Sequence, residues 1–324
     1  MSSHPPRLWR SSPFAFALLC AACGTTAVSG RPKSGVAEMQ GRQQPARFAQ
    51  VVPAGTHYAW DERRTFDATL VGTSRTVRDE SDLRWDVSTH PSVLDTTVFD
   101  QRLVRATVTH DGRTVVDGAP EVTVQLVVDS GGNLQEVRGL DEASRVLRGL
   151  AEPQMRSWAD RMFSPQDLRS LLVSRYDLFV GHVDGRPTAR GTTWIATERP
   201  GGTTLLRRYT VEGTEPCGAA LCTRLRVRLD IDPRVVDPLA ERIVADYLQS
   251  QGRPAPKLTI ERTSYGMGGT LLVDAATMQT HSATLREAGR VVVTAPDRAY
   301  EVDVHATTDD TFQYGPPEMP VGSL

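Results

Sequence analysis

The chain has 324 residues, of which 39% are hydrophobic, and its 37 basic and 39 acidic side chains give a formal net charge of −2. This length is enough to bury roughly 70–75% of the unfolded surface in one large domain or two smaller ones, without a metal or a dense set of disulfides. The near-neutral charge argues against a nucleic-acid-binding protein, which usually carries a strong basic excess. Four cysteines are too few for a disulfide-rich scaffold.

Residues 1–22 have the pattern of an export signal. They contain no acidic residue, carry Arg7 and Arg10, and continue into the apolar run Phe14–Ala22. Nine apolar residues are too few to span a bilayer, which takes about 20. They match the hydrophobic region of a secretory signal that is followed by small residues at the cleavage point. We therefore predict a signal peptide over 1–22.

The segment LCAACG at 19–24 resembles a bacterial lipobox, in which the cysteine after two small residues receives diacylglycerol and becomes the mature N-terminus. The chain departs from the family at the third position before Cys23, where Cys20 replaces the usual Leu. The resemblance implies a lipoprotein that is acylated at Cys23, with fatty acids such as palmitate. Because Gly24 and not Asp follows, it also implies the outer membrane in a cell that has one. Ordinary secretion with cleavage near Ala22 and a short uncleaved anchor are the alternatives.

Residues 23–55 are predicted to form a disordered tether, because Gly, Ser, Pro, Gln and Ala dominate and no apolar period persists. About 30 flexible residues have an r.m.s. reach of roughly 30 Å. The tether holds four basic residues and one acidic residue, which could contact anionic lipid or have no role beyond spacing. The remaining residues, 56–324, carry 31 basic and 38 acidic side chains, so the body is acidic.

The body, 56–314, is predicted to be an α+β, β-rich unit that begins with strands over 56–139. Apolar residues occupy every second place in Thr65–Val71 and Asp82–Ser88, as in half-buried strands. Asp111-Gly112 and Asp117-Gly118 each follow a strand-like run and predict tight hairpins. The pattern indicates an antiparallel meander with one polar face.

A helical insert is predicted over 140–181, where the apolar period changes to that of a helix. Its third helix begins with Ser164 as N-cap and Pro165 in the first turn. An apolar group on its second helix is interpreted as core, with the lining of a lipid-binding mouth as the alternative; the group comprises Met155, Trp158, Met162 and Phe163.

Further strands are predicted over 190–231 and 257–314, on either side of a helix over 233–251. Asp232-Pro233 or Asp237-Pro238 begins this helix, and Pro238 fits best in its first turn. Gly266–Gly269 is interpreted as a bulge or turn, and 315–324 as a flexible tail. These elements predict an antiparallel curved sheet or sheets, as a half-barrel or sandwich, with the helical insert and one further long helix. Their order favours two related sheet units.

Cys217 and Cys222 are predicted to form a disulfide, because they flank a turn between two strands of an exported protein. So short a loop gains only about 2 kcal/mol in the chain-entropy model, so its use would be to fix the turn. A redox-active pair is disfavoured by four intervening residues, where the thioredoxin type has two. A zinc site is disfavoured because no further ligand stands nearby in the sequence.

No catalytic, cofactor-binding or metal-binding residue is assigned from the sequence. The histidines form no ligand-like pair, and each is interpreted as a surface or hydrogen-bonded side chain; those of the body are His57, His90, His110, His182, His281 and His305. Neither a nucleophile elbow nor a phosphate-binding glycine loop is present. Asp230, Asp232 and Asp237 lack the calcium-loop spacing. The sequence thus predicts a protein that is not an enzyme and needs no cofactor.

The body resembles the lipoprotein-carrier and lipid-transfer lipoproteins of the bacterial envelope. The likeness lies in the order of elements over about 57–312, including the strand Gly191–Trp194 and the closing Gly268–Asp274 with the turn Ala275–Met278. It implies a curved antiparallel sheet around an apolar cavity that helices close, and it transfers no ligand-contacting residue.

Together these features predict a membrane-anchored, non-enzymatic envelope lipoprotein that binds a lipid or another hydrophobic ligand. Its partners would be the membrane, through the N-terminal lipid, and a hydrophobic small molecule, with no nucleic acid. One alternative is an assembly module that docks envelope proteins through a sheet edge. An enzyme with dispersed catalytic residues is the other.

Overall fold

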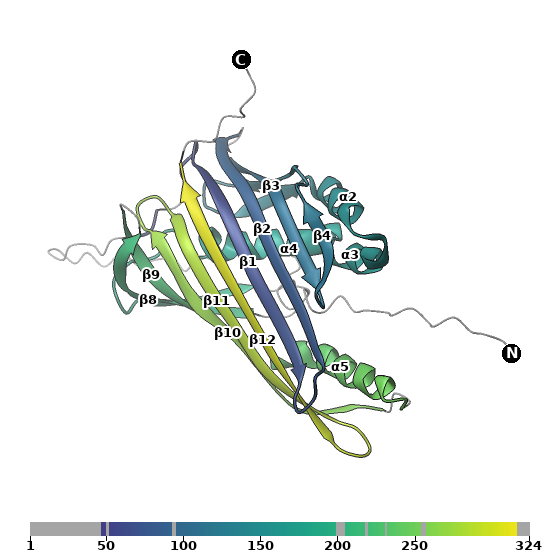
Figure 1. Cartoon of the computed structure of the whole chain (residues 1–324). Helices are drawn as coiled ribbons and strands as arrows, with labels where there is room; N and C mark the ends of the chain where they lie inside the picture. Colours follow the sequence, from purple (N-terminus) through teal and green to yellow (C-terminus); the bar gives the residue numbers. More distant parts are fainter. Residues whose placement is uncertain are drawn as a thin grey trace.

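One antiparallel sheet of 12 strands dominates the computed structural model, which describes residues 47–49, 52–92, 95–198, 205–217, 220–230, 232–253 and 257–315 (Figure 1). The strand order is β6-β5-β3-β2-β1-β12-β11-β10-β9-β8-β7, with β4 paired to β3. The predicted signal peptide, Cys23 and the tail after 315 lie outside the described residues. The strands are β1 (His57–Leu70), β2 (Thr76–Pro91), β3 (Thr97–His110), β4 (Arg113–Gly118), β5 (Val122–Val128), β6 (Leu134–Arg138), β7 (Thr193–Glu198), β8 (Leu205–Cys217), β9 (Ala220–Asp230), β10 (Thr259–Asp274), β11 (Gln279–Thr294) and β12 (Ala299–Tyr314).

The two faces of the sheet differ in polarity, as the alternating sequence predicts. In β1 the side chains from Trp60 to Leu70 at even positions are buried, and those between them are exposed or half-buried. The outer face carries exposed ion pairs between neighbouring strands, such as Arg102–Asp86 at 2.7 Å and Arg290–Asp303 at 2.8 Å. An antiparallel sheet with one covered and one wet face fits this pattern, and the β-rich α+β fold with a curved sheet is confirmed.

The expected pair of sheet units is wrong, because all the strands that the structure describes belong to one sheet. Gly269 lies inside the continuous strand β10, where a Cβ atom would meet the backbone oxygen of Thr284 on β11 at 2.0 Å. The glycine therefore permits a close approach of two strands and makes no turn. The hairpin predicted at Asp117-Gly118 is also wrong, because both residues belong to β4 and pair with β3. The turn predicted at Asp111-Gly112 is confirmed, with positive φ at both residues.

Two separate helical layers cover the same face of the sheet. The insert contains α2 (Leu140–Leu150), η1 (Pro153–Met155), α3 (Arg156–Met162), α4 (Pro165–Tyr176) and the π-helical turn η2 (Asp177–Gly181). The second layer is η4 (Pro233–Val236) with α5 (Asp237–Ser250), and Figure 1 shows α5 toward the opposite end of the long strands from α2 and α3. No described helix is long and apolar enough to cross a membrane.

The predicted helix starts are confirmed. The hydroxyl of Ser164 accepts a hydrogen bond from the backbone N–H of Asp167 at 3.1 Å, which caps α4. Pro238 lies in the first turn of α5, where its missing N–H costs nothing.

Each helical layer encloses its own hydrophobic cluster against the sheet. The first cluster lies under α2–α4 and includes Trp60, Phe99, Tyr176, Phe179 and Phe312. The second cluster lies under α5 and is formed by Phe66, Leu70, Ile243, Val302 and other mainly aliphatic side chains. Because β1 and β12 contribute to both clusters, the same sheet face holds two separate cores.

The end of the expected tether packs against this body. Phe48 is buried, its ring lies 6.4 Å from that of Trp194, and its backbone N–H donates to the oxygen of Arg186 at 2.8 Å. Val52 is also buried. The packed body therefore begins before residue 55, held there by these two apolar side chains.

Candidate ligand-binding site

A small, partly enclosed cavity lies between the sheet and the last turn of α4 with η2. Its volume is about 30 Å³, which is room for a water molecule or two. Pockets for small organic ligands measure about 300–1,000 Å³, so this cavity as it stands is too small for a lipid. The lining residues are Val52, Tyr58, Trp60, Phe99, Gln101, Arg175, Tyr176, Phe179, Val180, Met278, Thr280, Phe312 and Tyr314.

Stacked aromatic rings form the wall of the cavity. Trp60 and Phe312, from the adjacent strands β1 and β12, are parallel within 6° at 5.9 Å. Phe179 of η2 meets both edge-on, at 6.0 Å from Trp60 and 5.2 Å from Phe312. Such pairs contribute about 0.5–1.5 kcal/mol each beyond their buried area. The contact between η2 and the sheet is therefore specific in its geometry.

One polar atom of the cavity lining has no partner. The side-chain oxygen of Gln101 on β3 is buried and accepts no hydrogen bond from the described residues. A buried acceptor without a donor costs about 1–3 kcal/mol. A water molecule or the donor group of a ligand would remove this cost, so Gln101 gives the aromatic cavity a polar recognition point.

A shallow surface groove adjoins the cavity. It has a volume of about 510 Å³ and is lined by Ala54, Gly55, Thr56, His57, Gln279, Tyr314 and Gly315. Tyr314 lines both spaces and therefore stands between them. Its hydroxyl donates to the backbone oxygen of Thr280 at 2.9 Å, and its ring lies 5.1 Å from that of Tyr58. The side chain of Tyr314 is therefore a wall that the cavity and the groove share.

A belt of buried charges begins at one side of the cavity. Arg175 of α4 donates to Asp310 of β12 at 3.0 Å and to Glu62 of β1. All three side chains are buried. Burial alone would lower the pKa of Arg175, but the two carboxylates together raise it above its usual value. Arg175 is therefore a charged link between the helical layer and the sheet.

Asp310 is the titratable member of this group. Burial and the nearby Glu62 raise the pKa of Asp310 to about 7, although Arg175 and the indole N–H of Trp60, which donates at 2.9 Å, act in the opposite direction. One Oε atom of Glu62 is buried without a hydrogen-bond partner in the described part of the chain. A single guanidinium is thus shared between two carboxylates.

The belt continues across the sheet between the two clusters. Arg64 of β1 lies 3.8 Å from Glu287 of β11, and the hydroxyl of Tyr265 on β10 donates to the same carboxylate. Burial and the charge of Glu287 raise the pKa of Tyr265, so this phenol stays neutral at physiological pH. The belt separates the aromatic first cluster from the aliphatic second cluster.

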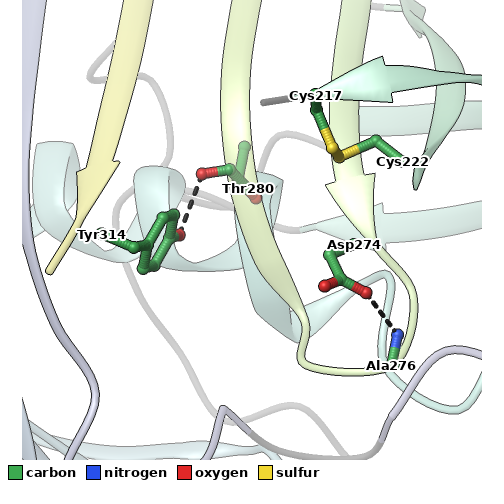
Figure 2. The surroundings of a disulfide bond; sticks show 6 residues. All are labelled: Cys217, Cys222, Asp274, Ala276, Thr280 and Tyr314. Carbon is green, nitrogen blue, oxygen red and sulfur yellow. Dashed lines mark hydrogen bonds between the residues drawn. A yellow bond between two sulfur atoms is a disulfide. The ribbon is translucent and has the colours of Figure 1, made fainter. Parts of the chain in front are cut away.

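The residues singled out in the sequence lie elsewhere. Cys217 and Cys222 form a disulfide at the hairpin between β8 and β9 (Figure 2). Met155, Met162 and Phe163 belong to the first cluster and none lines the cavity, whereas the side chain of Trp158 lies outside the described part of the chain. Asp232 caps the turn at Arg234, which fits the predicted helix start and not a cation site.

Three histidines of the body have distinct surroundings, and His281 differs from the other two because it lies beside the disulfide. His110 lies 2.5 Å from Asp79, and His182 is buried, which lowers its pKa to about 3 and keeps it neutral. His281 lies beside the disulfide, so that a ring nitrogen and both sulfurs are within 4.8 Å of one another. No sequence pattern indicated this grouping, because His281 is on β11, far from the cysteines along the chain.

The buried belt was also missed by reasoning from sequence. Glu62, Arg64 and Asp310 occupy inward positions of strands, where the alternation predicts apolar side chains. A charged residue at such a position is the signal that could have indicated them.

Comparisons with known proteins give no family. No protein-family model matches the chain, and no curated protein resembles it in sequence. Among solved structures, lipovitellin, from a study of lipid–protein interactions, has a TM-score of 0.45 at 12% identity over 85% of this chain. The chain spans 27% of the length of that lipovitellin chain.

Two bacterial proteins are less similar. An outer membrane channel from Pseudomonas putida F1 gives a TM-score of 0.21 at 8% identity, over 84% of this chain and all of that chain. A DUF1329 family protein from Desulfovibrio piger gives 0.18 at 9% identity, over 82% of this chain and 87% of that chain. All three TM-scores lie below 0.5 and are too low to transfer a function.

Proposed function

We propose that this protein is an exported, lipid-anchored protein of the bacterial envelope that binds a hydrophobic ligand between the sheet and η2. The observation that carries the proposal is the aromatic cavity with the unpartnered oxygen of Gln101 in its wall. An apolar enclosure with one or two placed polar groups is the usual composition of a small-molecule site. The ligand would have an apolar body and a hydrogen-bond donor that faces Gln101.

Binding requires the site to open, because about 30 Å³ is too small for an acyl chain or a ring system. Tyr314 and the η2 turn are the parts that would move. π-Helical turns occur mostly as local irregularities and are frequent at functional sites. The Arg175 link and the hydrogen bond from Tyr176 to the backbone oxygen of Gly132, at 2.8 Å, hold α4 closed in the absence of ligand.

Native mass spectrometry of the full-length protein, extracted from a bacterial envelope, tests this function. We expect one non-covalent lipid-like adduct per chain, which is lost on unfolding, in addition to acylation at Cys23. Gln101→Leu should lower the adduct occupancy while raising the stability of the empty protein, because it removes the unsatisfied acceptor. Gln313→Leu, at an exposed position of β12, is the matched control. A ligand-free wild type, or equal effects of both variants, would contradict the proposal.

The second candidate is a docking module, favoured by the closely packed sheet face and by an exposed sheet edge. Within the described residues β7 pairs only with β8, and Ile195 on β7 is 49% exposed. An unpaired edge with an apolar side chain can add a strand from a partner. A photo-crosslinker at Thr197 should then capture one envelope protein in cells, and Ile195→Lys should abolish this product. A crosslinker at His305, on the outer face, is the control for nonspecific capture. If the crosslinker at Thr197 captures the same mixture of proteins as this control, the docking module is excluded.

A further inference from the structure

Two sulfur atoms and an imidazole converge at residues that line neither the aromatic cavity nor the groove. Cys217 at the end of β8 and Cys222 at the start of β9 lie with their Cα atoms 5.7 Å apart. The two sulfurs and a ring nitrogen of His281 lie within 4.8 Å of one another. Thiolate and imidazole are the ligands that zinc and copper(I) prefer in proteins.

A β-bulge places His281 in this position. Leu272 of β10 pairs with Ser282 of β11, and the next residue, Val273, pairs with Thr280, so His281 is the extra residue of β11. Bulges redirect a side chain out of the regular alternation and are frequent next to functional sites. The ring of His281 lies 5.3 Å from that of Tyr314. The hydroxyl of Tyr314 donates a hydrogen bond to the backbone oxygen of Thr280 (Figure 2). The imidazole is therefore oriented by its neighbours.

His281 also has an unused nitrogen. Its Nε2 atom is buried and has no hydrogen-bond partner in the part of the chain that the structure describes. Buried polar atoms without partners are uncommon, and each needs an explanation such as an ion or a redox role. A metal ion bound to this nitrogen would satisfy it.

We propose that Cys217, Cys222 and His281 form a redox-gated site for a thiophilic metal ion, Zn²⁺ or Cu⁺. In the oxidised protein the disulfide uses both sulfurs and the site is closed. An external dithiol reduces the bond: the two Sγ atoms gain two electrons and two protons, and the dithiol becomes a disulfide. Binding of the metal then displaces both thiol protons, and the neutral His281 supplies the third ligand.

The arrangement suits this coordination. Tetrahedral zinc holds sulfur at about 2.3 Å and nitrogen at about 2.0–2.1 Å. The three ligand atoms already lie within 4.8 Å of one another, and reduction of the disulfide frees the two sulfurs to separate around a metal ion. Cys222 is fully buried and Cys217 nearly so, and a cation offsets the cost of burying two thiolates. Three protein ligands leave one position open for water or another molecule. None of the three metal ligands lines the aromatic cavity.

Spectroscopy with Co²⁺ tests the proposal on the full chain. After reduction with a phosphine, we expect one Co²⁺ per chain with the visible bands of a tetrahedral site and the near-ultraviolet charge transfer of thiolate ligands. Excess Zn²⁺ should bleach both signals, and the oxidised protein should show neither. Near-ultraviolet circular dichroism should show that the reduced protein stays folded, because a loop this short contributes only about 2 kcal/mol.

His281→Ala should weaken Co²⁺ binding at least about tenfold, since loss of even an outer partner of a ligand has that effect. His305→Ala, on the exposed side of β12, should change nothing. His281→Cys should restore binding with stronger charge transfer. Absence of bands in the reduced protein, unfolding on reduction, or bands of equal strength in His281→Ala would each overturn the proposal.

Discussion

The two clusters on the same sheet face differ in what they are built from. The second cluster packs aliphatic side chains of α5 against β1, β11 and β12. The first cluster stacks aromatic rings around a cavity, contains the unpartnered Gln101, and connects to a buried ion pair through Arg175. The second region has the composition of a plain core, and the first has features that stability alone does not explain. The difference is the reason why the proposed ligand site lies in the first region.

The belt of buried charges between the two clusters carries a desolvation cost, which hydrophobic side chains at the same positions would avoid. Replacement of a buried ion pair by apolar residues is often neutral or stabilising, whereas removal of one partner is not. The belt therefore holds α4 in a defined place by a link that a change of charge can weaken. On α5, by contrast, the ion pair of Asp246 with Arg75 at 3.7 Å is partly exposed, so water weakens it.

The largest effect should come from removing the link itself. Arg175→Met leaves Glu62 and Asp310 buried without their cation, so we expect a loss of about 3–5 kcal/mol in the free energy of unfolding. Urea denaturation at neutral pH measures it. Arg290→Met, which removes exposed outer-face ion pairs to Glu301 and Asp303, is the control and should have little effect. Equal effects of the two variants would show that the belt is not special.

The next largest effect is a pH dependence of the free energy of unfolding, caused by the ionisation of Asp310 in the belt. Because the folded protein raises the pKa of Asp310 from 3.8 to about 7, between these values the folded state holds a proton that the unfolded state has released. This contribution to stability is therefore present at low pH and is lost as pH rises from about 4 to 7. Its size is on the order of a few kcal/mol, because each tenfold change in a proton dissociation constant corresponds to about 1.4 kcal/mol.

Asp310→Asn isolates this contribution, because the amide mimics the protonated acid and cannot ionise. Urea unfolding at several pH values gives the free energy of unfolding of the wild type and of the variant. The wild-type value minus the variant value should fall toward alkaline pH and level off above about 7. A constant difference across this range would contradict the raised pKa. Opening of α4 for the ligand would also make the rate of ligand exchange depend on the ionisation of Asp310. This rate should then rise above pH 7 in the wild type and not in Asp310→Asn.

The smallest effect is expected when one side chain of each cluster is replaced by a larger one. Phe179→Trp adds volume beside the cavity, and Ile243→Phe adds volume to the second cluster. Overpacking of either core should cost about 1–3 kcal/mol. Only Phe179→Trp should also reduce the occupancy of a hydrophobic ligand in native mass spectrometry. A similar reduction by Ile243→Phe would place the ligand elsewhere or show a general loss of folding.

The local structure of this protein could be predicted from its sequence. The alternation of β1 and β12, the cap at Ser164 and the position of Pro238 each depend on a few neighbouring residues, and the structure confirms them. The continuity of β10 was not predicted, because Gly269 acts through the strand beside it and not through its own turn.

The sites depended on tertiary structure. Arg175 meets Glu62 across 113 positions and Asp310 across 135, because β1 pairs with β12 and α4 lies over both. His281 lies beside the cysteines at the extra position of a bulge in β11, next to the end of β8 and the start of β9. Sequence periodicity reports which side of its own element a residue occupies. Which distant residue it meets there is set by the order of strands in the sheet, and only the folded chain fixes that order.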